Sequence, residues 1–238
     1  MARGRTRLAS VPTRIPHPTA HRLSLYLREL QSLRSAGRAT VNSREIADAV
    51  GVSSAVVRKD LALAIGGGRS ATPRIGHAGV GYDCETLAGR IRSIVGKDHA
   101  WRAVLVGCGH IGRALLGYGG FAENGFEIVG VFDRQPSVVG KVAGRLKVQP
   151  MADLRRTIRT TGAEIGIIAV PREAAQAVAT DLAAAGVRGI LNFAPMRLAL
   201  VEDVPVANID VSVALDQLAL DISSQAGSSG RRGKAGEK

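Results

Sequence analysis

The stretch AVLVGCGHIGRALLGY, residues 103–118, decides the fold of the second half of this chain. A short apolar strand over 103–106 runs directly into Gly107-x-Gly109-x-x-Gly112 and then into a helical pattern. The first glycine allows a tight turn, the second lets the backbone approach a pyrophosphate, and the third lets the helix pack closely on the strand. N–H groups at the start of the helix favour an anion. The pattern therefore predicts a dinucleotide site.

A second apolar strand, EIVGVFD, supports this reading because it ends in Asp133, 21 residues beyond Gly112. A carboxylate at this place accepts hydrogen bonds from the adenosine ribose hydroxyls and repels a 2′-phosphate, which favours NAD over NADP. The neighbouring Arg134 weakens that preference but does not reverse it. For Cys108 a small residue that fills the turn is a better interpretation than a redox thiol. The predicted residues for NADH or NAD+ are Gly107, Cys108, Gly109, His110, Ile111, Gly112 and Asp133.

The remaining sequence of this half alternates short Val/Ile-rich strands with helical segments. Strands are predicted within EIGIIAVP, VRGILNF and VPVANID, with a helix over 172–185. Such alternation indicates an α/β fold with a Rossmann-type, doubly wound parallel sheet covered by helices on both faces. Only one amphipathic helix, within 211–223, follows the last strand. This leaves no room for a substantial substrate domain, and we expect no catalytic residue.

The first half reads as a helix-turn-helix. Helical spacing of apolar residues begins near Thr19 and stops at Gly37, a second short helix ends at Gly51, and a third runs over 53–65. Two short helices joined by a tight glycine turn form the motif whose second helix enters the DNA major groove. Its predicted DNA contacts are Ser53, Ser54, Arg58 and Lys59. The alternative is a small helical bundle whose cations only solvate a surface.

Residues 66–82 are rich in turn-forming residues and predict either a β-hairpin wing or a flexible linker. A further helix within 83–96 closes this domain. We expect a disordered basic arm over 1–18, a DNA-binding domain over 19–98, a dinucleotide-binding domain over 99–209, a C-terminal helix over 210–224 and a disordered basic tail over 225–238. Prolines at 12, 16 and 18 argue against a helix in the arm.

The charge follows this division. The formal net charge is +12, of which residues 1–100, with 16 basic and 7 acidic side chains, carry +9, residues 101–226 carry none and the tail carries +3. A basic first domain and tail favour a polyanionic partner. Two cysteines, Cys84 and Cys108, cannot build a disulfide framework or a zinc site, and we expect no metal. The sequence has no long apolar run and no secretory signal, so we expect a cytoplasmic protein without membrane contact.

From about residue 15 to 223 the chain resembles the Rex family of redox-sensing transcriptional repressors. The resemblance is carried by RLSLYLRELQSL, SREIADAVGVSSAVVRKDL, GVGYDCETL, VGCGHIGRAL with YGGF, FEIVGVFD, AVPREAAQAVA, GILNFAP and VANID. It implies a homodimer in which a winged helix-turn-helix domain binds operator DNA and a Rossmann domain binds NADH or NAD+. It also implies a C-terminal helix swapped to the partner subunit, and release from DNA by NADH.

The resemblance also assigns residues. It makes Arg58 and Lys59 the principal DNA contacts, and it places Tyr118 near the nicotinamide. Arg28 and Asp210 resemble a charged pair that changes partners between the DNA-bound and NADH-bound arrangements. The chain departs from the family in the stretch before GVGY, which is longer, lacks the family's aromatic residues and has His77-Ala78 in place of its basic pair. The alternative from another class is an NAD-dependent oxidoreductase whose helical N-terminus serves dimerisation.

Overall fold

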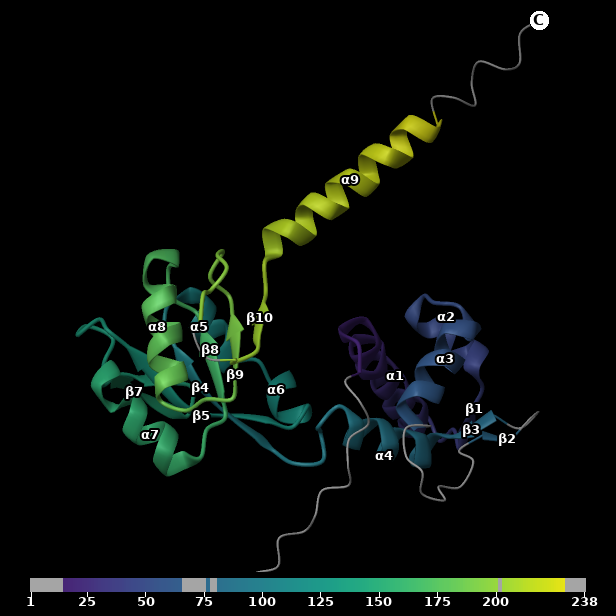
Figure 1. Ribbon diagram of the computed structural model, residues 1–238, viewed down its shortest axis with the longest axis horizontal. Helices are drawn as coiled ribbons and strands as arrows, with labels where there is room; N and C mark the ends of the chain where they lie inside the picture. The colour runs from purple at the N-terminus through teal and green to yellow at the C-terminus, as the bar shows by residue number, and fades with distance from the viewer. Residues whose placement is uncertain (1–14, 66–75, 78–80, 201–202, 230–238) are drawn as a thin grey trace, which may run out of the picture. The chain divides into compact units, whose positions relative to one another are not determined.

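The computed structural model describes residues 15–65, 76–77, 81–200 and 203–229, and it divides into two compact units. The first unit comprises Met1–His99 and the second Ala100–Lys238. Each is described by itself below (Figure 1). The expected boundary between residues 98 and 99 lies within one residue of this division. The expected basic arm up to residue 14 and the tail from residue 230 lie outside the described residues.

The first unit is a helical domain with a small sheet. Its elements are α1 (His17–Ser35), β1 (Thr40–Val41), α2 (Ser43–Val50), α3 (Ser54–Ile65), β2 (Gly76–His77), β3 (Gly81–Asp83) and α4 (Cys84–Ile94). The strands form an antiparallel sheet in the order β1-β3-β2. Apolar side chains of all four helices form one buried core. The β2–β3 pairing is that of a wing, whereas residues 66–75 and 78–80 lie outside the described part.

Helix α1 starts earlier than the sequence predicted. It begins at His17, inside the segment expected as a disordered arm, and Pro18 lies in its first turn. Proline is tolerated there because the first helical N–H groups have no intrahelical acceptor, so the missing donor costs nothing. The expected arm over 1–18 is therefore wrong at its end, and the prolines at 16 and 18 mark a helix start.

The turn between α2 and α3 is built by local hydrogen bonds. Asn42 and Glu45 form a reciprocal capping box that starts α2, and Gly51, in the left-handed region at φ 73°, ends it. The hydroxyl of Ser53 then accepts a hydrogen bond from the Val56 N–H at 3.3 Å, at the start of α3. These residues give the predicted helix-turn-helix.

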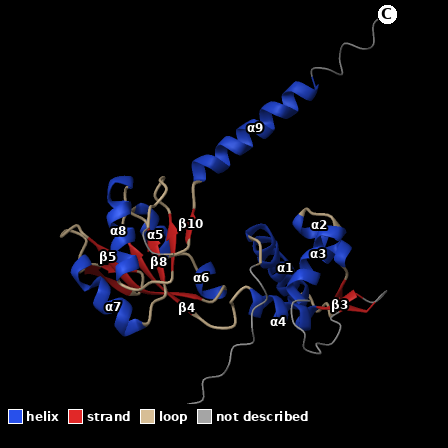
Figure 2. Cartoon of the chain, in the orientation of Figure 1, coloured by secondary structure: helices blue, strands red, loops and turns tan. Residues whose placement is uncertain are grey.

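The second unit is a sheet between helical layers. Its elements are β4 (Trp101–Val106), α5 (His110–Leu116), α6 (Gly120–Glu123), β5 (Phe126–Asp133), β6 (Val142–Ala143), β7 (Leu146–Pro150), the 3₁₀ turn η1 (Met151–Asp153), α7 (Leu154–Thr161), β8 (Ile165–Ile168), α8 (Arg172–Ala184), β9 (Gly189–Asn192), β10 (Val206–Asn208) and α9 (Val211–Ser229). The strand order is β10-β9-β8-β4-β5-β7-β6. Figure 2 shows these strands in red among the helices.

Successive side chains of β4 point to opposite faces of the sheet and join different cores. Val104 and Val106 join a core with α7 and α8, whereas Ala103 and Leu105 join a core with α5. Six of the strands pair in parallel; five of them were predicted, and β7 was not. The antiparallel β6–β7 hairpin was not predicted, although its two-residue turn carries Gly144 at φ 60°.

Helix α9 extends further than expected, to Ser229 rather than to residue 224. No proline interrupts it, and Gly227 weakens a helix by about 1 kcal/mol without ending it. Every side chain described on this helix, from residue 211 to 224, is exposed within the chain.

Candidate functional site

A cavity of about 650 Å³ opens at the carboxyl ends of the central strands of the second unit. Strand β4 pairs with β5 on one side and with β8, reached only later in the chain, on the other, so the strand order reverses between β4 and β8. Ligands of open α/β sheets bind at such a reversal. The cavity is lined by Val106, Gly107, Cys108, Gly109, His110, Arg113, Asp133, Arg134, Gln135, Val138, Met151, Ala169, Val170, Pro171, Glu173, Ala174, Ala177, Val178 and Asp181.

The three glycines of the loop have different surroundings. Gly107 has φ 101°, and a Cβ there would lie 2.5 Å from the Ala169 carbonyl oxygen. A Cβ on Gly112 would collide with the carbonyl oxygen of Gly107. By contrast, a Cβ on Gly109 would meet no atom within 4 Å. Gly107 and Gly112 are thus required by the fold, while Gly109 faces open space into which a ligand can approach the backbone.

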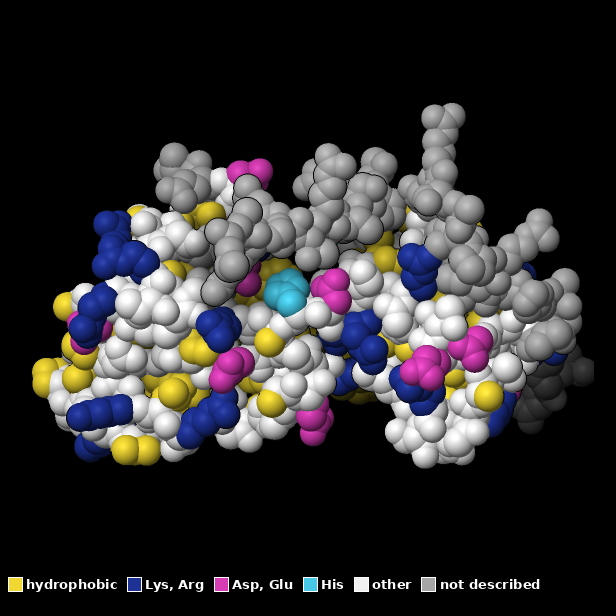
Figure 3. All heavy atoms as spheres, turned by 90° about the horizontal axis from the view of Figure 1, so that it is seen from below, with side chains coloured by type: hydrophobic (Ala, Val, Ile, Leu, Met, Phe, Trp, Pro, Cys, Tyr) yellow, Lys and Arg dark blue, Asp and Glu magenta, His cyan; other side chains and the backbone are white. Residues whose placement is uncertain are grey.

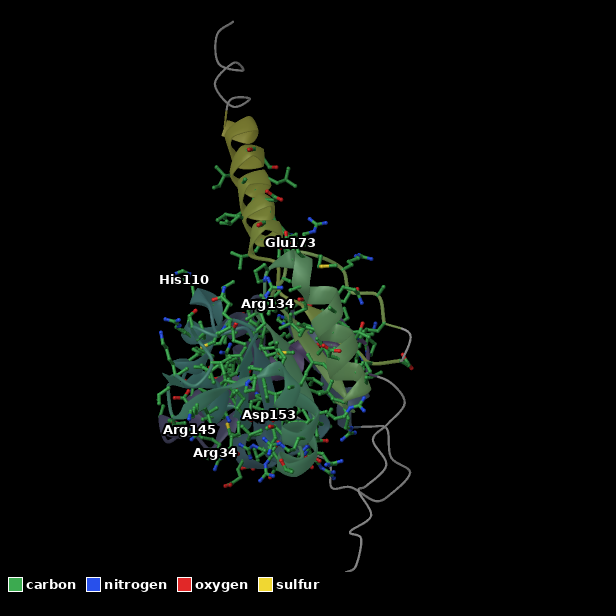
Figure 4. The ribbon with its side chains drawn as sticks, turned by 90° about the vertical axis from the view of Figure 1, so that its left-hand side faces the viewer. Arg34, His110, Arg134, Arg145, Asp153 and Glu173 are labelled. Carbon is green, nitrogen blue, oxygen red and sulfur yellow. The ribbon has the colours of Figure 1, made fainter. Side chains whose placement is uncertain are left out.

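Asp133 holds the glycine loop in place. Its Oδ2 accepts a hydrogen bond from the Cys108 N–H at 2.8 Å, and its Oδ1 accepts one from the Gln135 N–H at 2.9 Å. Each carboxylate oxygen keeps acceptor capacity for a hydroxyl group. Figure 4 labels His110, Arg134 and Glu173, which all line the same cavity.

The structure brings most of the predicted dinucleotide residues together, but not all. Gly107, Cys108, Gly109, His110 and Asp133 line the cavity. Gly112 is buried beneath the loop, where it allows the close packing of α5. Ile111 and Tyr118 are about half exposed, at 50% and 54%, and are not among the residues that line it. The Tyr118 ring meets the Phe121 ring edge-on, with centroids 5.3 Å apart.

Several lining residues were not predicted from the sequence. Arg113 lies on α5, and its Nε donates a hydrogen bond to the Cys108 carbonyl at 3.0 Å. The segment after β8 and the first turns of α8 supply Ala169, Pro171 and Glu173. A usable signal was present, because the carboxyl ends of adjacent parallel strands meet at one edge of a sheet. Cys108 itself is buried and its thiol is free, as expected of a small turn residue.

In the first unit, α3 presents the predicted DNA-binding residues. Arg58 and Lys59 are exposed, Ser53 is exposed and Ser54 is half-buried. The Arg58 guanidinium donates a hydrogen bond to the Ser43 hydroxyl at 3.2 Å, which links α3 to the start of α2. Cations and hydroxyls at the start of a recognition helix suit phosphates and base edges.

The expected switch pair belongs to different units. Arg28 is exposed on α1 of the first unit, where it lines a shallow groove with Ala49 and Val50. Asp210 belongs to the second unit, and its Oδ1 accepts hydrogen bonds from the N–H groups of Ser212 at 2.9 Å and Val213 at 3.4 Å. Asp210 therefore caps α9. The pairing of Arg28 with Asp210 stays a prediction.

The described residues also bear on metal sites and on membrane spans. Within 15–65, 76–77, 81–200 and 203–229, no three His, Cys, Asp or Glu side chains are grouped so that they could hold a metal ion. None of the helices in these ranges is long and apolar enough to cross a membrane. On the face seen in Figure 3, basic and acidic side chains of the second unit are interspersed.

Two family models match the chain. One, described as a CoA binding domain, covers residues 98–196. The other, “Putative DNA-binding protein N-terminus”, covers residues 14–62. The matches fall on the second and the first unit respectively.

Curated relatives match nearly the whole chain. A redox-sensing transcriptional repressor Rex from Carboxydothermus hydrogenoformans is 44% identical over 209 residues, which cover 88% of this chain and 97% of the relative. A protein of the same name from Streptomyces coelicolor is 42% identical over 228 residues, which cover 95% of this chain and 85% of the relative.

Solved structures of RSP, a Rex-family repressor, share the fold. Its complex with beta-NADH superposes with a TM-score of 0.78 at 27% identity and covers 91% of this chain and 98% of RSP. Its complex with beta-NAD+ and operator DNA superposes with a TM-score of 0.81 at 28% identity and covers 94% of this chain and 99% of RSP.

Proposed function

Because this chain belongs to the Rex family of redox-sensing transcriptional repressors, we propose that it binds operator DNA and that NADH releases it. The observation that carries the proposal is the cavity at the strand reversal, where a glycine loop and a fixed carboxylate lie together. The same chain also contains a helix-turn-helix. The RSP complexes with beta-NADH and with beta-NAD+ and operator DNA support both ligands. The protein is a regulator rather than an enzyme, as its relatives are named repressors, and the oxidoreductase alternative is set aside.

The fit of the dinucleotide rests on three features of the cavity. Its volume, about 650 Å³, lies within the range of small-molecule sites. The open space beside Gly109 lets a pyrophosphate approach the backbone at the start of α5. Asp133, fixed by two backbone N–H groups, offers both oxygens to the adenosine ribose. When bound, the nicotinamide supplies the redox state that is sensed.

We further propose that the functional unit is a homodimer formed through α9. Val211, Leu215, Leu218 and Ile222 recur at helical spacing on one side of this helix, and each is at least 55% exposed. Val213 and Leu220, equally exposed, lie on the opposite side. A helix that is apolar on two sides needs cover on both, and a second copy of this chain supplies it.

Because the repressor must meet both chromosomal DNA and the NADH pool, we place it in the cytoplasm.

The central experiment measures DNA binding at fixed salt while the NADH/NAD+ ratio is varied. The probe is a duplex selected from a random-sequence pool by the wild-type protein, and binding is followed by fluorescence anisotropy. We expect binding in NAD+ and release as NADH rises. Coenzyme A and NADPH serve as competing ligands, since one family model is described as a CoA binding domain. Binding that ignores the ratio, or that responds to coenzyme A instead, contradicts the proposal.

The dimer is tested by sedimentation velocity on Leu218→Asp and on Ser223→Asp. Both variants add one negative charge to α9, but Ser223 lies outside both apolar sides of the helix. We expect Leu218→Asp to sediment as a monomer and Ser223→Asp as a dimer. Equal sedimentation of the two variants contradicts the assignment of this surface.

A further inference from the structure

One carboxylate in the first unit is buried among polar partners from another helix. Asp60 of α3 is 3% exposed and accepts hydrogen bonds from three side chains of α1, which lies 34 to 41 residues earlier. The Arg22 guanidinium donates to both carboxylate oxygens, from Nε at 2.6 Å and from a terminal nitrogen at 2.8 Å. The Tyr26 hydroxyl donates at 2.9 Å and the Thr19 hydroxyl at 3.1 Å. We call these four residues the Asp60 cluster.

The cluster keeps its charges although it is buried. Burial alone would raise the pKa of Asp60, but the hydrogen bonds from Arg22, Tyr26 and Thr19 outweigh burial and lower it. The pKa of Arg22 is raised, mainly by its hydrogen bond to Asp60. A buried ion pair of this kind is weak evidence for added stability, because well-packed apolar residues would serve as well. What it adds is geometry, since two parallel N–H···O bonds fix both the distance and the plane of the pair.

That geometry bears on DNA contacts because of where Asp60 lies in α3. It directly follows Arg58 and Lys59, and in a helix these neighbours point away from the side that Asp60 occupies. Asp60 is buried, whereas Arg58 and Lys59 are exposed. Rotation or sliding of α3 against α1 would therefore displace both exposed cations, and the bidentate pair opposes both movements.

We propose that Asp60 is a positioning residue for DNA recognition, which clamps α3 to α1 through Arg22 and Tyr26 and thereby sets where Arg58 and Lys59 meet the DNA. This inference rests on the proposed function, because it assumes that α3 reads operator DNA. It is specific to sequence recognition. Nonspecific binding depends on the number of cations rather than on their exact placement.

The test uses Arg22→Lys in the full-length protein. Lysine keeps the charge, so the electrostatic attraction to any duplex is retained, but an ammonium group cannot make the two parallel hydrogen bonds of a guanidinium. The probes are the selected duplex defined above and a scrambled duplex of the same length. Binding of each is measured at 25 °C and fixed salt. We expect affinity for the selected duplex to fall at least tenfold, and affinity for the scrambled duplex to change less than twofold.

A matched control separates positioning from stability. Ile91 is fully buried in the same core, on α4, and takes no part in the Asp60 cluster. Ile91→Val and Ile91→Ala are expected to lower the melting temperature by different amounts. The Ile91 variant whose melting temperature is closest to that of Arg22→Lys serves as the control. We expect that control to bind both duplexes like the wild type. Tyr26→Phe, which removes one hydrogen bond and leaves the ion pair, should lose less affinity for the selected duplex than Arg22→Lys does.

The outcomes distinguish this inference from the function on which it rests. If the wild type selects no duplex or ignores NADH, the proposed function fails. If the wild type selects one and Arg22→Lys binds it as tightly as the matched Ile91 variant, the Asp60 cluster is only structural and this inference is wrong. An equal loss for both duplexes overturns it as well, since positioning affects only sequence-specific binding.

Discussion

At the residue scale, Asp133 combines two tasks in one carboxylate. It anchors the glycine loop through the Cys108 N–H and lines the cavity, where we propose that it accepts the adenosine ribose hydroxyls of the dinucleotide. Asp133→Asn keeps the shape but removes the charge, and one of its two acceptors becomes a donor facing an N–H group. Hydrogen bonds to a charged group contribute about 1.5–3 kcal/mol. We expect NADH affinity to fall about tenfold or more, measured by calorimetry.

The same variant has a built-in control. Operator binding in the absence of NADH depends on the first unit, so it should stay at the wild-type level. Loss of the carboxylate also removes its repulsion of a 2′-phosphate, so the ratio of NADPH to NADH affinity should rise. Unchanged NADH affinity would show that Asp133 only holds the loop.

Tyr26 makes a pH-dependent contribution to stability. Burial, followed by its hydrogen bond to Asp60, raises its pKa from 10.0 to about 12. Because the folded-state pKa is raised, the contribution is complete below pH 10 and is lost as the pH rises through about 12. In urea titrations, the wild type should therefore lose on the order of 2 kcal/mol of unfolding free energy over this range that Tyr26→Phe does not lose.

The comparison of wild type with Tyr26→Phe isolates this residue. Burial also raises the pKa of Cys84 and lowers that of Lys97, but both groups titrate equally in the two proteins. Parallel stability curves between pH 10 and 12 would mean that the Tyr26 proton is not held by the fold. At neutral pH the variant should be less stable by about 1 kcal/mol, the cost of one hydrogen bond.

The Asp60 cluster also shows a limit of sequence reasoning at this scale. In VRKDL, Asp60 reads as one more charge next to Arg58 and Lys59, and no periodicity separates it from them. Its partners on α1 lie 34 or more residues away in the sequence. Only the packing of α1 against α3 reveals that this carboxylate is buried, so its role could not be predicted from local pattern.

At the element scale, two glycines of one loop should respond differently to the same change. A methyl group on Gly112 collides with the Gly107 carbonyl, so Gly112→Ala should lower the melting temperature of the second unit or prevent its folding. A methyl group on Gly109 meets no protein atom within 4 Å, so Gly109→Ala should fold normally. It should nevertheless lose at least tenfold in NADH affinity, because the methyl group fills the space expected for the pyrophosphate.

Calorimetry of both variants, for unfolding and for NADH binding, checks this pair. If Gly109→Ala binds NADH with wild-type affinity, the pyrophosphate does not bind at this loop. Normal stability of Gly112→Ala would contradict the close contact of α5 with the Gly107 carbonyl.

Elements with strong local signals could be predicted, and those that depend on weak ones could not. The glycine spacing and the Val/Ile strands predicted the central β4, β5 and β8, and the Gly51 turn predicted the helix-turn-helix. The β6–β7 hairpin was missed because β6 has only two residues and β7, LKVQP, lacks the run of Val and Ile that marks the predicted strands. The start of α1 was misplaced because a proline was read as a helix breaker rather than as a first-turn residue.

At the scale of the whole molecule, the charge distribution agrees with a division of labour between the units. Residues 1–100 carry a net charge of +9, residues 101–226 carry none, and the C-terminal tail carries +3. Salt should therefore weaken operator binding strongly and NADH binding little. For communication between operator binding and NADH binding, the family resemblance supplies Arg28 of the first unit and Asp210 of the second as the candidates.

This communication must be reciprocal. If saturating NADH lowers operator affinity by some factor, saturating operator DNA must lower NADH affinity by the same factor, which typically lies between about 5 and 150. Asp210 caps α9, and asparagine caps a helix as well as aspartate does, so Asp210→Asn removes the charge without removing the cap. We expect Asp210→Asn and Arg28→Ala each to bring the factor towards one, measured by anisotropy in one direction and calorimetry in the other, while both proteins still bind NADH. A wild-type factor in both variants would place the coupling elsewhere than in this pair.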